Sequence, residues 1–155
     1  MMMRLCSDVI RSLDGRTLVT AESCTGGGIG AALTAVPGSS AVFKGGIISY
    51  TNWVKENALQ VPSELLETYG AVSAQVAQAM AEGARSVLQA DVAVSVTGLA
   101  GPSGDDFGNP VGTVYIGYAD EYGSKAYGYQ FSGDREDIRN AAISAALGIV
   151  LCEID

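Results

Sequence analysis

A serine and a cysteine stand side by side in the segment TAESCTGGG (residues 20–28), and both Ser23 and Cys24 are candidate nucleophiles. A serine hydroxyl needs a neighbouring base before it can attack a substrate. The chain contains no histidine, which excludes Ser-His-Asp and Cys-His catalytic arrangements and histidine metal sites. The base must then be a carboxylate or a lysine, and the chain has only three lysines, namely Lys44, Lys55 and Lys125.

Lys55 is the lysine best placed to serve as this base, because it follows the predicted strand 42–50 in the stretch YTNWVK. We expect it in a loop beyond the end of that strand. Only a neutral lysine is a base, and burial favours the neutral form because the charge loses its solvation by water. The alternative is an ordinary solvated surface charge. The adjacent Trp53 is more typical of packing than of a platform on which a ligand stacks.

Three glycines, Gly26, Gly27 and Gly28, follow the candidate nucleophiles at a predicted junction between strand and helix. Glycine disfavours a helix start, so the run needs another explanation. One explanation is a ligand that approaches the backbone closely, with free N–H groups that attract an anion. The other is a helix capped by Thr25 and packed tightly on the sheet. The segment is not a Walker loop, because the Gly-Lys-Ser/Thr ending is missing.

Two later segments are candidates for ligand contacts. The glycine-rich segment 98–113 is long enough to shape a site, although flexible connections have the same composition. The segment 131–137 begins the last predicted helix, where acidic residues suit the helix dipole. Arg135 does not suit it, which makes Arg135 a candidate contact for a phosphate or carboxylate. Asp105 and Asp106 are candidate carboxylate ligands for Mg²⁺; the alternative is that both are solvated loop charges.

Predicted strands and helices alternate along the chain, with one hairpin near its end. Hydrophobic spacing predicts strands at 16–21, 42–50, 92–98, 112–119 and 125–131, and helices at 3–14, 29–36, 62–69, 73–89 and 134–153. This order indicates one domain over residues 1–155 with an α/β fold, in which three layers (α/β/α) surround a mixed, mostly parallel sheet of about five strands. In such folds the site lies at the carboxyl ends of the strands.

The composition of the chain limits the binding partners and the cellular compartment that we expect for it. Seventeen Asp and Glu against nine Lys and Arg give a net charge of −8, which disfavours nucleic acid and anionic membranes as partners. Three scattered cysteines argue against a zinc site or a disulfide framework, and we expect Cys6 and Cys152 to be small core residues. No secretory segment is visible, so the expected location is the cytoplasm. We expect neither a metal nor a cofactor.

Four segments, in this order, resemble the CinA-like family, which comprises the C-terminal domain of competence/damage-inducible CinA and a stand-alone nicotinamide-nucleotide amidase. They are TAESCTGG, GSS with FKGGIISYTN-x-x-K, GAVS, and GLAGPSG…NPVGTVY with FSGDR. The resemblance covers residues 17–151. It implies deamidation of nicotinamide mononucleotide without a required metal, with Ser23 as nucleophile, Lys55 as base and Tyr50 beside them.

The sequence departs from this family pattern at two places. Trp53-Val54 stands where the family often has Glu-Ala, and Gly28 stands where a bulkier residue is common. Both departures are expected to alter the pocket.

The mechanism predicted from these assignments is acyl transfer. Neutral Lys55 takes the proton of Ser23, which attacks the carboxamide carbon; ammonia leaves, and water hydrolyses the acyl-enzyme. N–H groups of the following turn hold the oxyanion, and the phosphate is assigned to Arg135 and the loop 98–104. The predicted binding residues are Cys24, Thr25, Gly26, Gly27, Gly98, Gly101 and Arg135.

Two alternatives stay open. Glu22, Cys24 and Lys55 form a competing set based on cysteine, although a thiol is a stronger acid than an ammonium group and would protonate the neutral amine. A non-catalytic nucleotide-binding module would use the same glycine loops, with Lys55 as a cation that contacts the ligand. In both cases the expected partner is a small nucleotide, bound by a homo-oligomer whose size the sequence does not define.

Overall fold

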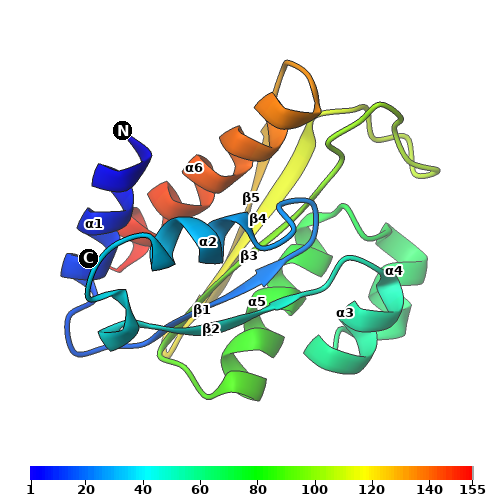
Figure 1. The fold of residues 1–155 in the computed structure, drawn as a ribbon. Helices are drawn as coiled ribbons and strands as arrows, with labels where there is room; N and C mark the ends of the chain where they lie inside the picture. Colours follow the sequence, from blue (N-terminus) through cyan, green and yellow to red (C-terminus); the bar gives the residue numbers. More distant parts are fainter. Residues whose placement is uncertain (155) are drawn as a thin grey trace.

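A five-stranded sheet in the order β2-β1-β3-β4-β5 forms the middle of the molecule (Figure 1). The computed structural model describes residues 1–154. β1 pairs in parallel with both β2 and β3, whereas β4 is antiparallel to both β3 and β5, so four strands run in one direction. The predicted mixed, mostly parallel sheet is thereby confirmed. The strands are β1 (Leu18–Glu22), β2 (Phe43–Ile48), β3 (Val92–Gly98), β4 (Thr113–Asp120) and β5 (Gly123–Gln130).

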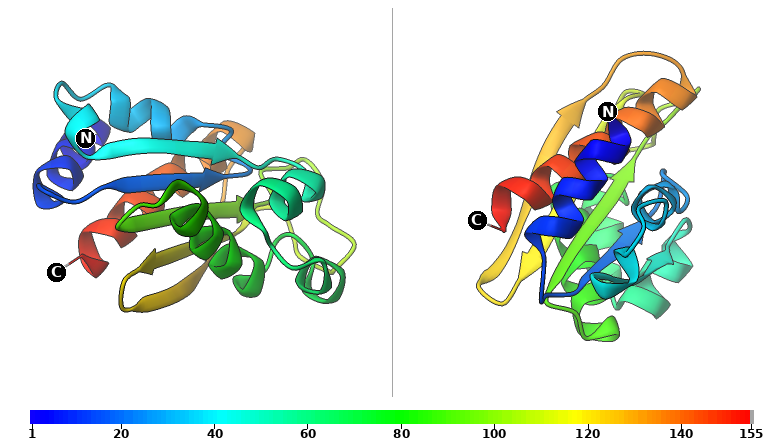
Figure 2. Two further views of the ribbon diagram at one scale, coloured as in Figure 1. Left: turned by 90° about the horizontal axis from the view of Figure 1, so that it is seen from below. Right: turned by 60° about the vertical axis from the view of Figure 1, so that its left-hand side comes forward.

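Helices cover both faces of this sheet and give the predicted three layers. Helices α1, α2 and α6 lie on one face and α3, α4 and α5 on the other (Figure 1). Figure 2 shows α1 and α6 lying side by side. Each face has its own buried hydrophobic cluster. The helices are α1 (Met2–Ser12), α2 (Gly28–Thr34), α3 (Asn52–Leu59), α4 (Ser63–Tyr69), α5 (Ala74–Leu88) and α6 (Arg135–Glu153), with a short 3-10 helix η1 (Ser39–Ala41) before β2.

Helix α3 is the element that hydrophobic spacing failed to predict. Thr51 caps it, because its side chain accepts a hydrogen bond from the backbone N–H of Val54. The buried positions of the helix are Lys55 and Leu59, so a lysine stands where an apolar residue would have marked the inward face. Lys55 therefore lies in a helix, and its predicted placement in a loop is wrong.

The two cysteines expected in the core differ in their surroundings. Cys6 is buried in α1, as predicted, whereas Cys152 is exposed near the end of α6. The inward face of α6 is set by Ile143, Leu147 and Val150, and Cys152 falls outside this helical stripe. The apolar composition around Cys152 in the sequence was therefore a poor guide to its burial.

The carboxyl ends of three strands meet at one edge of the sheet. Glu22, the last residue of β1, pairs with Ile48 at the end of β2 and with Val96 in β3. The segments that follow these strands begin close together, at Ser23 and Ser49 and after Gly98. This is the edge at which α/β sheets bind their ligands.

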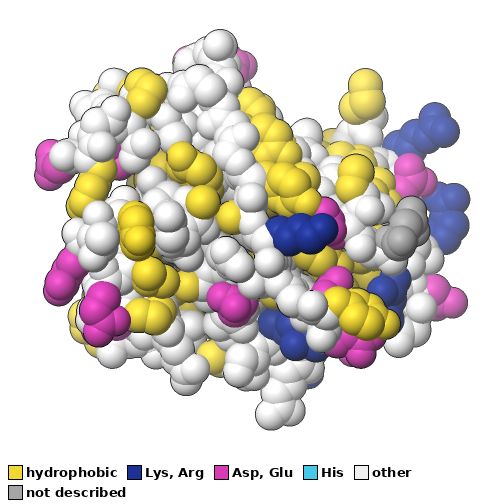
Figure 3. Space-filling model, turned by 180° about the vertical axis from the view of Figure 1, so that it is seen from behind, with side chains coloured by type: hydrophobic (Ala, Val, Ile, Leu, Met, Phe, Trp, Pro, Cys, Tyr) yellow, Lys and Arg dark blue, Asp and Glu magenta, His cyan; other side chains and the backbone are white. Residues whose placement is uncertain are grey.

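Acidic side chains do not gather into one patch on the face of the molecule that Figure 3 shows. Figure 3 shows the side opposite to that of Figure 1, where acidic, basic and hydrophobic side chains are intermixed. Among residues 1–154, no helix combines the length and the apolar character that crossing a membrane requires. The charged side chains that are buried lie instead at the strand ends, around Ser23.

Candidate active site

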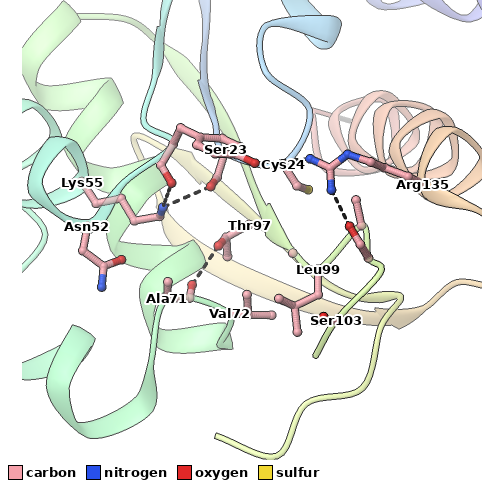
Figure 4. A pocket seen from close by; sticks show the side chains of 14 residues that line it. Ser23, Cys24, Asn52, Lys55, Ala71, Val72, Thr97, Leu99, Ser103 and Arg135 are labelled. Atoms are coloured by element: carbon pink, nitrogen blue, oxygen red, sulfur yellow. Dashed lines mark hydrogen bonds between the residues drawn. The ribbon is translucent and has the colours of Figure 1, made fainter. Parts of the chain in front are cut away.

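A cavity of about 290 Å³ opens at the carboxyl ends of the parallel strands (Figure 4). It receives side chains from the turn after β1, from the start of α3, from the segments before α5 and after β3, and from the first turn of α6. The predicted site residues that line it are Ser23, Cys24, Tyr50, Lys55, Gly98, Gly101 and Arg135. The structure does not bring the other three, Thr25, Gly26 and Gly27, into this lining.

Lys55 and Ser23 point toward each other across the cavity (Figure 4). Lys55 Nζ donates hydrogen bonds to Ser23 Oγ at 3.1 Å and to the backbone carbonyls of Ser49 at 2.8 Å and Tyr50 at 3.3 Å. A neutral amine keeps two N–H donors and one lone pair. If the two carbonyls accept the two N–H groups, the lone pair faces the hydroxyl of Ser23. This is the geometry that general-base catalysis needs.

Burial makes the neutral form of Lys55 accessible. The side chain is 1% exposed, and no carboxylate in residues 1–154 forms an ion pair with it. Desolvation lowers the pKa of Lys55 from 10.5 to about 8, against a smaller opposing influence of Cys24. Roughly a tenth of the molecules then carry a neutral Lys55 at pH 7, as the relation between pH and pKa requires.

The thiol of Cys24 is unsuited to be the nucleophile. Its side chain is 5% exposed, and desolvation by burial raises the pKa of Cys24 to about 11. The reactive species of a cysteine is the thiolate, which is scarce near neutral pH at such a pKa. Ser23, beside a neutral amine, is therefore the better candidate.

Glu22 also argues against the competing cysteine set, because its carboxylate serves the start of α2. One oxygen, Oε1, accepts hydrogen bonds from Thr25 Oγ1 at 2.7 Å and from the N–H of Ile29 at 2.8 Å. The other, Oε2, accepts the N–H of Gly30 at 3.0 Å. A buried carboxylate in this position suits the positive end of the helix dipole and joins the turn to α2. Glu22 thus shapes the turn, a role that the sequence analysis missed.

The glycine run is explained by the turn and by helix packing. Gly26 and Gly27 have φ angles of 59° and 100°, in the left-handed region that favours glycine. A Cβ on Gly28 would lie 2.6 Å from Ile143 Cδ1, so α2 approaches α6 too closely for a side chain there. The N-cap of α2 is Gly27 rather than Thr25, and Thr25 donates its hydroxyl hydrogen to Glu22 instead.

Arg135 joins two walls of the cavity. Its guanidinium donates hydrogen bonds to the carbonyl of Gly101 and to the hydroxyl of Tyr50. On another side, Thr97 Oγ1 donates to the carbonyl of Ala71 at 2.8 Å, which connects the end of β3 to the segment before α5.

Some residues of the cavity were not predicted from the sequence. They are Asn52, Ala71, Val72 and Thr97 in the lining, and Ser49 through its carbonyl. Ser49 acts through its backbone, which no side-chain pattern reveals.

Asp105 shapes the loop after β3. Its carboxylate accepts hydrogen bonds from the N–H groups of Phe107 and Asn109, and from Asn109 Nδ2 at 2.8 Å. Asn109 Nδ2 also donates to the carbonyl of Val72 on the cavity wall. Nowhere in residues 1–154 do three His, Cys, Asp or Glu side chains lie together as a metal-binding group. Of the two carboxylates considered for Mg²⁺, Asp105 and Asp106, that of Asp105 is thus occupied by the loop that it folds.

Comparison with known proteins shows the family of the chain. The family model of the CinA C-terminal domain matches residues 3–154. The chain belongs to the CinA C-terminal domain family. A CinA-like protein of Synechococcus sp. (strain RCC307) is 49% identical over 155 residues, which covers 97% of this chain and 37% of that relative. One from Parasynechococcus marenigrum (strain WH8102) is 57% identical over 121 residues, covering 78% of this chain and 29% of the relative. The chain therefore spans well under half the length of these curated relatives.

Solved structures of CinA superfamily proteins share the whole fold. A competence-damaged protein (CinA) superfamily protein from Klebsiella pneumoniae 700603 superposes with a TM-score of 0.96 at 33% identity, covering 99% of this chain and 98% of that one. The competence/damage inducible protein CihA from Agrobacterium tumefaciens does so with a TM-score of 0.94 at 39% identity, covering 97% and 94%. The predicted family resemblance is confirmed.

The positions expected to alter the pocket, Trp53-Val54 and Gly28, do not line the cavity. Trp53 is 71% exposed, so it is not the packed residue that its type favoured, and it does not belong to the lining. Gly28 lies between α2 and α6, against Ile143. The cavity of this CinA domain is therefore formed without a contribution from Trp53, Val54 or Gly28.

Proposed function

We propose that the chain is a nicotinamide-nucleotide amidase, which hydrolyses the carboxamide of nicotinamide mononucleotide to nicotinate mononucleotide and ammonia. The observation that carries this proposal is the 3.1 Å contact between Ser23 Oγ and Lys55 Nζ, a buried amine without a carboxylate partner in residues 1–154. A serine activated by a neutral lysine is a means of acyl transfer. The substrate itself is taken from the resemblance of the motifs to the amidase members of the family.

The reaction begins when Lys55 accepts the proton of Ser23 while Oγ attacks the carboxamide carbon. The ammonium group of Lys55 then gives its proton to the amide nitrogen, the C–N bond breaks, and ammonia leaves. Lys55, neutral again, takes a proton from water, whose oxygen attacks the ester carbon of the acyl-enzyme. The proton returns to Ser23 Oγ as the acid product departs, so the enzyme is unchanged.

Charge in the cavity supports an anionic substrate. The lining contains the guanidinium of Arg135 and no Asp or Glu, in a chain whose net charge is −8. The phosphate of the mononucleotide is assigned to the guanidinium of Arg135 and the loop 98–104. Arginine suits this contact because its planar donors match phosphate oxygens.

An assay of ammonia release from nicotinamide mononucleotide, with Ser23→Ala as the blank, tests the proposal directly. Ammonia formed by the parent and not by the variant supports it. Binding of the mononucleotide without ammonia release would favour the non-catalytic nucleotide-binding module instead.

The activity is expected to rise with pH. Desolvation lowers the pKa of Lys55 to about 8, and only the neutral amine is a base, so kcat/KM increases through about pH 8 and levels off above it. The measurement is kcat/KM from pH 6 to 9.5 for the parent and for Cys24→Ala, which keeps Lys55. A profile that is flat or falls across pH 8 in both proteins would contradict the role of Lys55.

Chelation is expected to leave turnover unchanged. The two reacting groups are an amine and a hydroxyl, and the Asp105 carboxylate already accepts hydrogen bonds from its own loop. The check is ammonia release after prolonged treatment with excess EDTA followed by desalting. Activity that disappears on treatment and returns with added Mg²⁺ would show that the site needs a metal.

A further inference from the structure

The cavity has an apolar wall on the side opposite to Ser23 and Lys55. In Figure 4 the side chains of Ala71, Val72 and Leu99 lie together on that side, and all three residues belong to the lining. Val72 is buried, whereas Ala71 and Leu99 are half-buried. No step of the proposed acyl transfer uses a side chain of this wall, so another role must explain it.

Hydrogen bonds from side chains hold the backbone of this wall. The carbonyl of Ala71 accepts a hydrogen bond from Thr97 Oγ1 at 2.8 Å, at the end of β3. The next carbonyl, that of Val72, accepts one from Asn109 Nδ2 at 3.1 Å, in the loop after β3. Asn109 Nδ2 also donates to the carboxylate of Asp105. The wall is therefore fixed in position, although Ala71 and Val72 belong to no helix or strand.

The residues on either side of the wall are fixed as well. A Cβ on Gly70 would lie 2.6 Å from Phe107 Cδ1, so the ring of Phe107 packs directly on the backbone there. Ser73 Oγ donates to the carbonyl of Gly70 at 2.9 Å, and Ser73 is the N-cap of α5. A wall held at each end keeps its shape when a ligand binds. Such a preformed surface favours a ligand whose own shape is rigid.

The substrate of the proposed reaction lies between the wall and the Ser23–Lys55 pair. Its carboxamide carbon must approach Ser23 Oγ to about 3–3.5 Å before attack. The group that bears the carboxamide is one bond further from Ser23, on the side of the cavity where Ala71 and Val72 lie. Both residues have only methyl groups at the ends of their side chains, so they contact this group through apolar surface.

We propose that Ala71 and Val72 are specificity-determining residues that pack against the face of a flat ring bearing the scissile carboxamide. This inference deepens the proposed amidase function and rests on it. The ring of nicotinamide mononucleotide fits the wall, because its faces carry no hydrogen-bonding group and its charge is spread over the ring. A flexible aliphatic amide loses more conformational entropy when it covers the same surface.

The test measures the binding of two ligands that differ in the ring. They are nicotinamide mononucleotide and ribose 5-phosphate, which keeps the sugar and the phosphate. Every protein in the test carries Ser23→Ala, so that the mononucleotide is not turned over. The dissociation constants are measured by NMR titration.

Two wall variants are compared with a matched control. Val72→Ala removes two methyl groups from the wall, and Ala71→Leu places a larger side chain in front of it. The control is Val36→Ala, because Val36 and Val72 are each 7% exposed and Val36 does not line the cavity.

Removal of two buried methyl groups from a contact weakens binding by about tenfold. For Val72→Ala we expect the Kd of the mononucleotide to rise by about that factor, and the Kd of ribose 5-phosphate to change by about twofold or less. Ala71→Leu should raise the Kd of the mononucleotide by about tenfold or more, because the leucine occupies the place of the ring. Val36→Ala should match the Ser23→Ala protein for both ligands.

Several outcomes would overturn the contact with the ring. A merely structural role of the wall would weaken the binding of both ligands alike. An unchanged Kd of the mononucleotide in a folded Val72→Ala protein would also refute the contact, and if that variant fails to fold, an unchanged Kd in Ala71→Leu would do so. Equal affinity of the Ser23→Ala protein for the two ligands would show that the ring adds nothing to binding.

The ring contact and the amidase can fail separately. Binding that depends on the wall, in a chain whose parent releases no ammonia, would refute the amidase and keep the contact for a non-catalytic nucleotide-binding module. Ammonia release by the parent, with binding that ignores the wall variants, would keep the amidase and refute the contact. A chain that neither binds the mononucleotide nor releases ammonia would refute both.

Discussion

Replacement of Lys55 by alanine is expected to abolish ammonia release, with a loss on the order of 10³-fold or more in kcat, as removal of a group that acts with the nucleophile typically costs. Lys55 Nζ is the only amine within reach of Ser23 Oγ among residues 1–154, at 3.1 Å. Without it no group accepts the serine proton. The measurement is kcat for ammonia release from nicotinamide mononucleotide at saturating substrate.

The other two lysines are the natural controls. Lys44 donates to the carbonyl of Gln89, and Lys125 pairs with Glu153 at 2.9 Å, both away from the cavity. Lys44→Ala and Lys125→Ala should therefore retain most of the activity.

A second variant of Lys55 distinguishes loss of the base from loss of the fold. Lys55→Ala leaves a void in place of a long buried side chain, and such voids destabilise a core. Lys55→Met keeps most of the volume without an amine, so it should fold and should be as inactive as Lys55→Ala. Rates near those of the parent in a folded Lys55→Met protein would exclude Lys55 as the base.

Replacement of Ser23 by alanine is expected to cost on the order of 10³-fold or more in kcat, and replacement of Cys24 far less. Ser23 Oγ lies beside the amine, whereas burial raises the pKa of Cys24 to about 11 and keeps it protonated. Cys24 is also nearly inaccessible, at 5% exposure, so a thiol alkylator should react with it slowly. The measurements are kcat for Ser23→Ala and Cys24→Ala, and turnover of the parent after alkylation.

Cys152 is exposed, so the alkylator will also react with its thiol. A variant without this thiol serves as the control. Cys152→Ser removes the accessible thiol, so any loss of turnover on alkylation of that variant reports on a buried cysteine. Should Cys24→Ala be the inactive variant, and alkylation at Cys24 stop turnover while Ser23→Ala stays active, the mechanism would be cysteine-based.

The sequence by itself determined the fold class and the candidate groups of the site. Alternation of apolar runs with helical patterns predicted the sheet and its layers, because strands that are covered on both faces are rich in apolar residues, as in the predicted strand 92–98. Two helix starts were equally visible: the predicted helices 73–89 and 134–153 begin at Ser73 and Asp134, which are the N-caps of α5 and α6. The absence of histidine reduced the amine bases to three lysines, and the motif order indicated Lys55. These features are local in sequence, so one chain without coordinates reveals them.

Only the tertiary structure decided how the candidate groups are used. Lys55 reaches Ser23 across 32 positions of sequence, and Asn109 reaches Val72 across 37. Glu22, a candidate partner of the cysteine, serves α2 instead, and the three residues Thr25, Gly26 and Gly27 stay outside the cavity lining. The lowered pKa of Lys55 comes from desolvation by burial. Hydrophobic spacing records which face of an element is buried, whereas the protonation of a buried amine depends on what surrounds it in three dimensions.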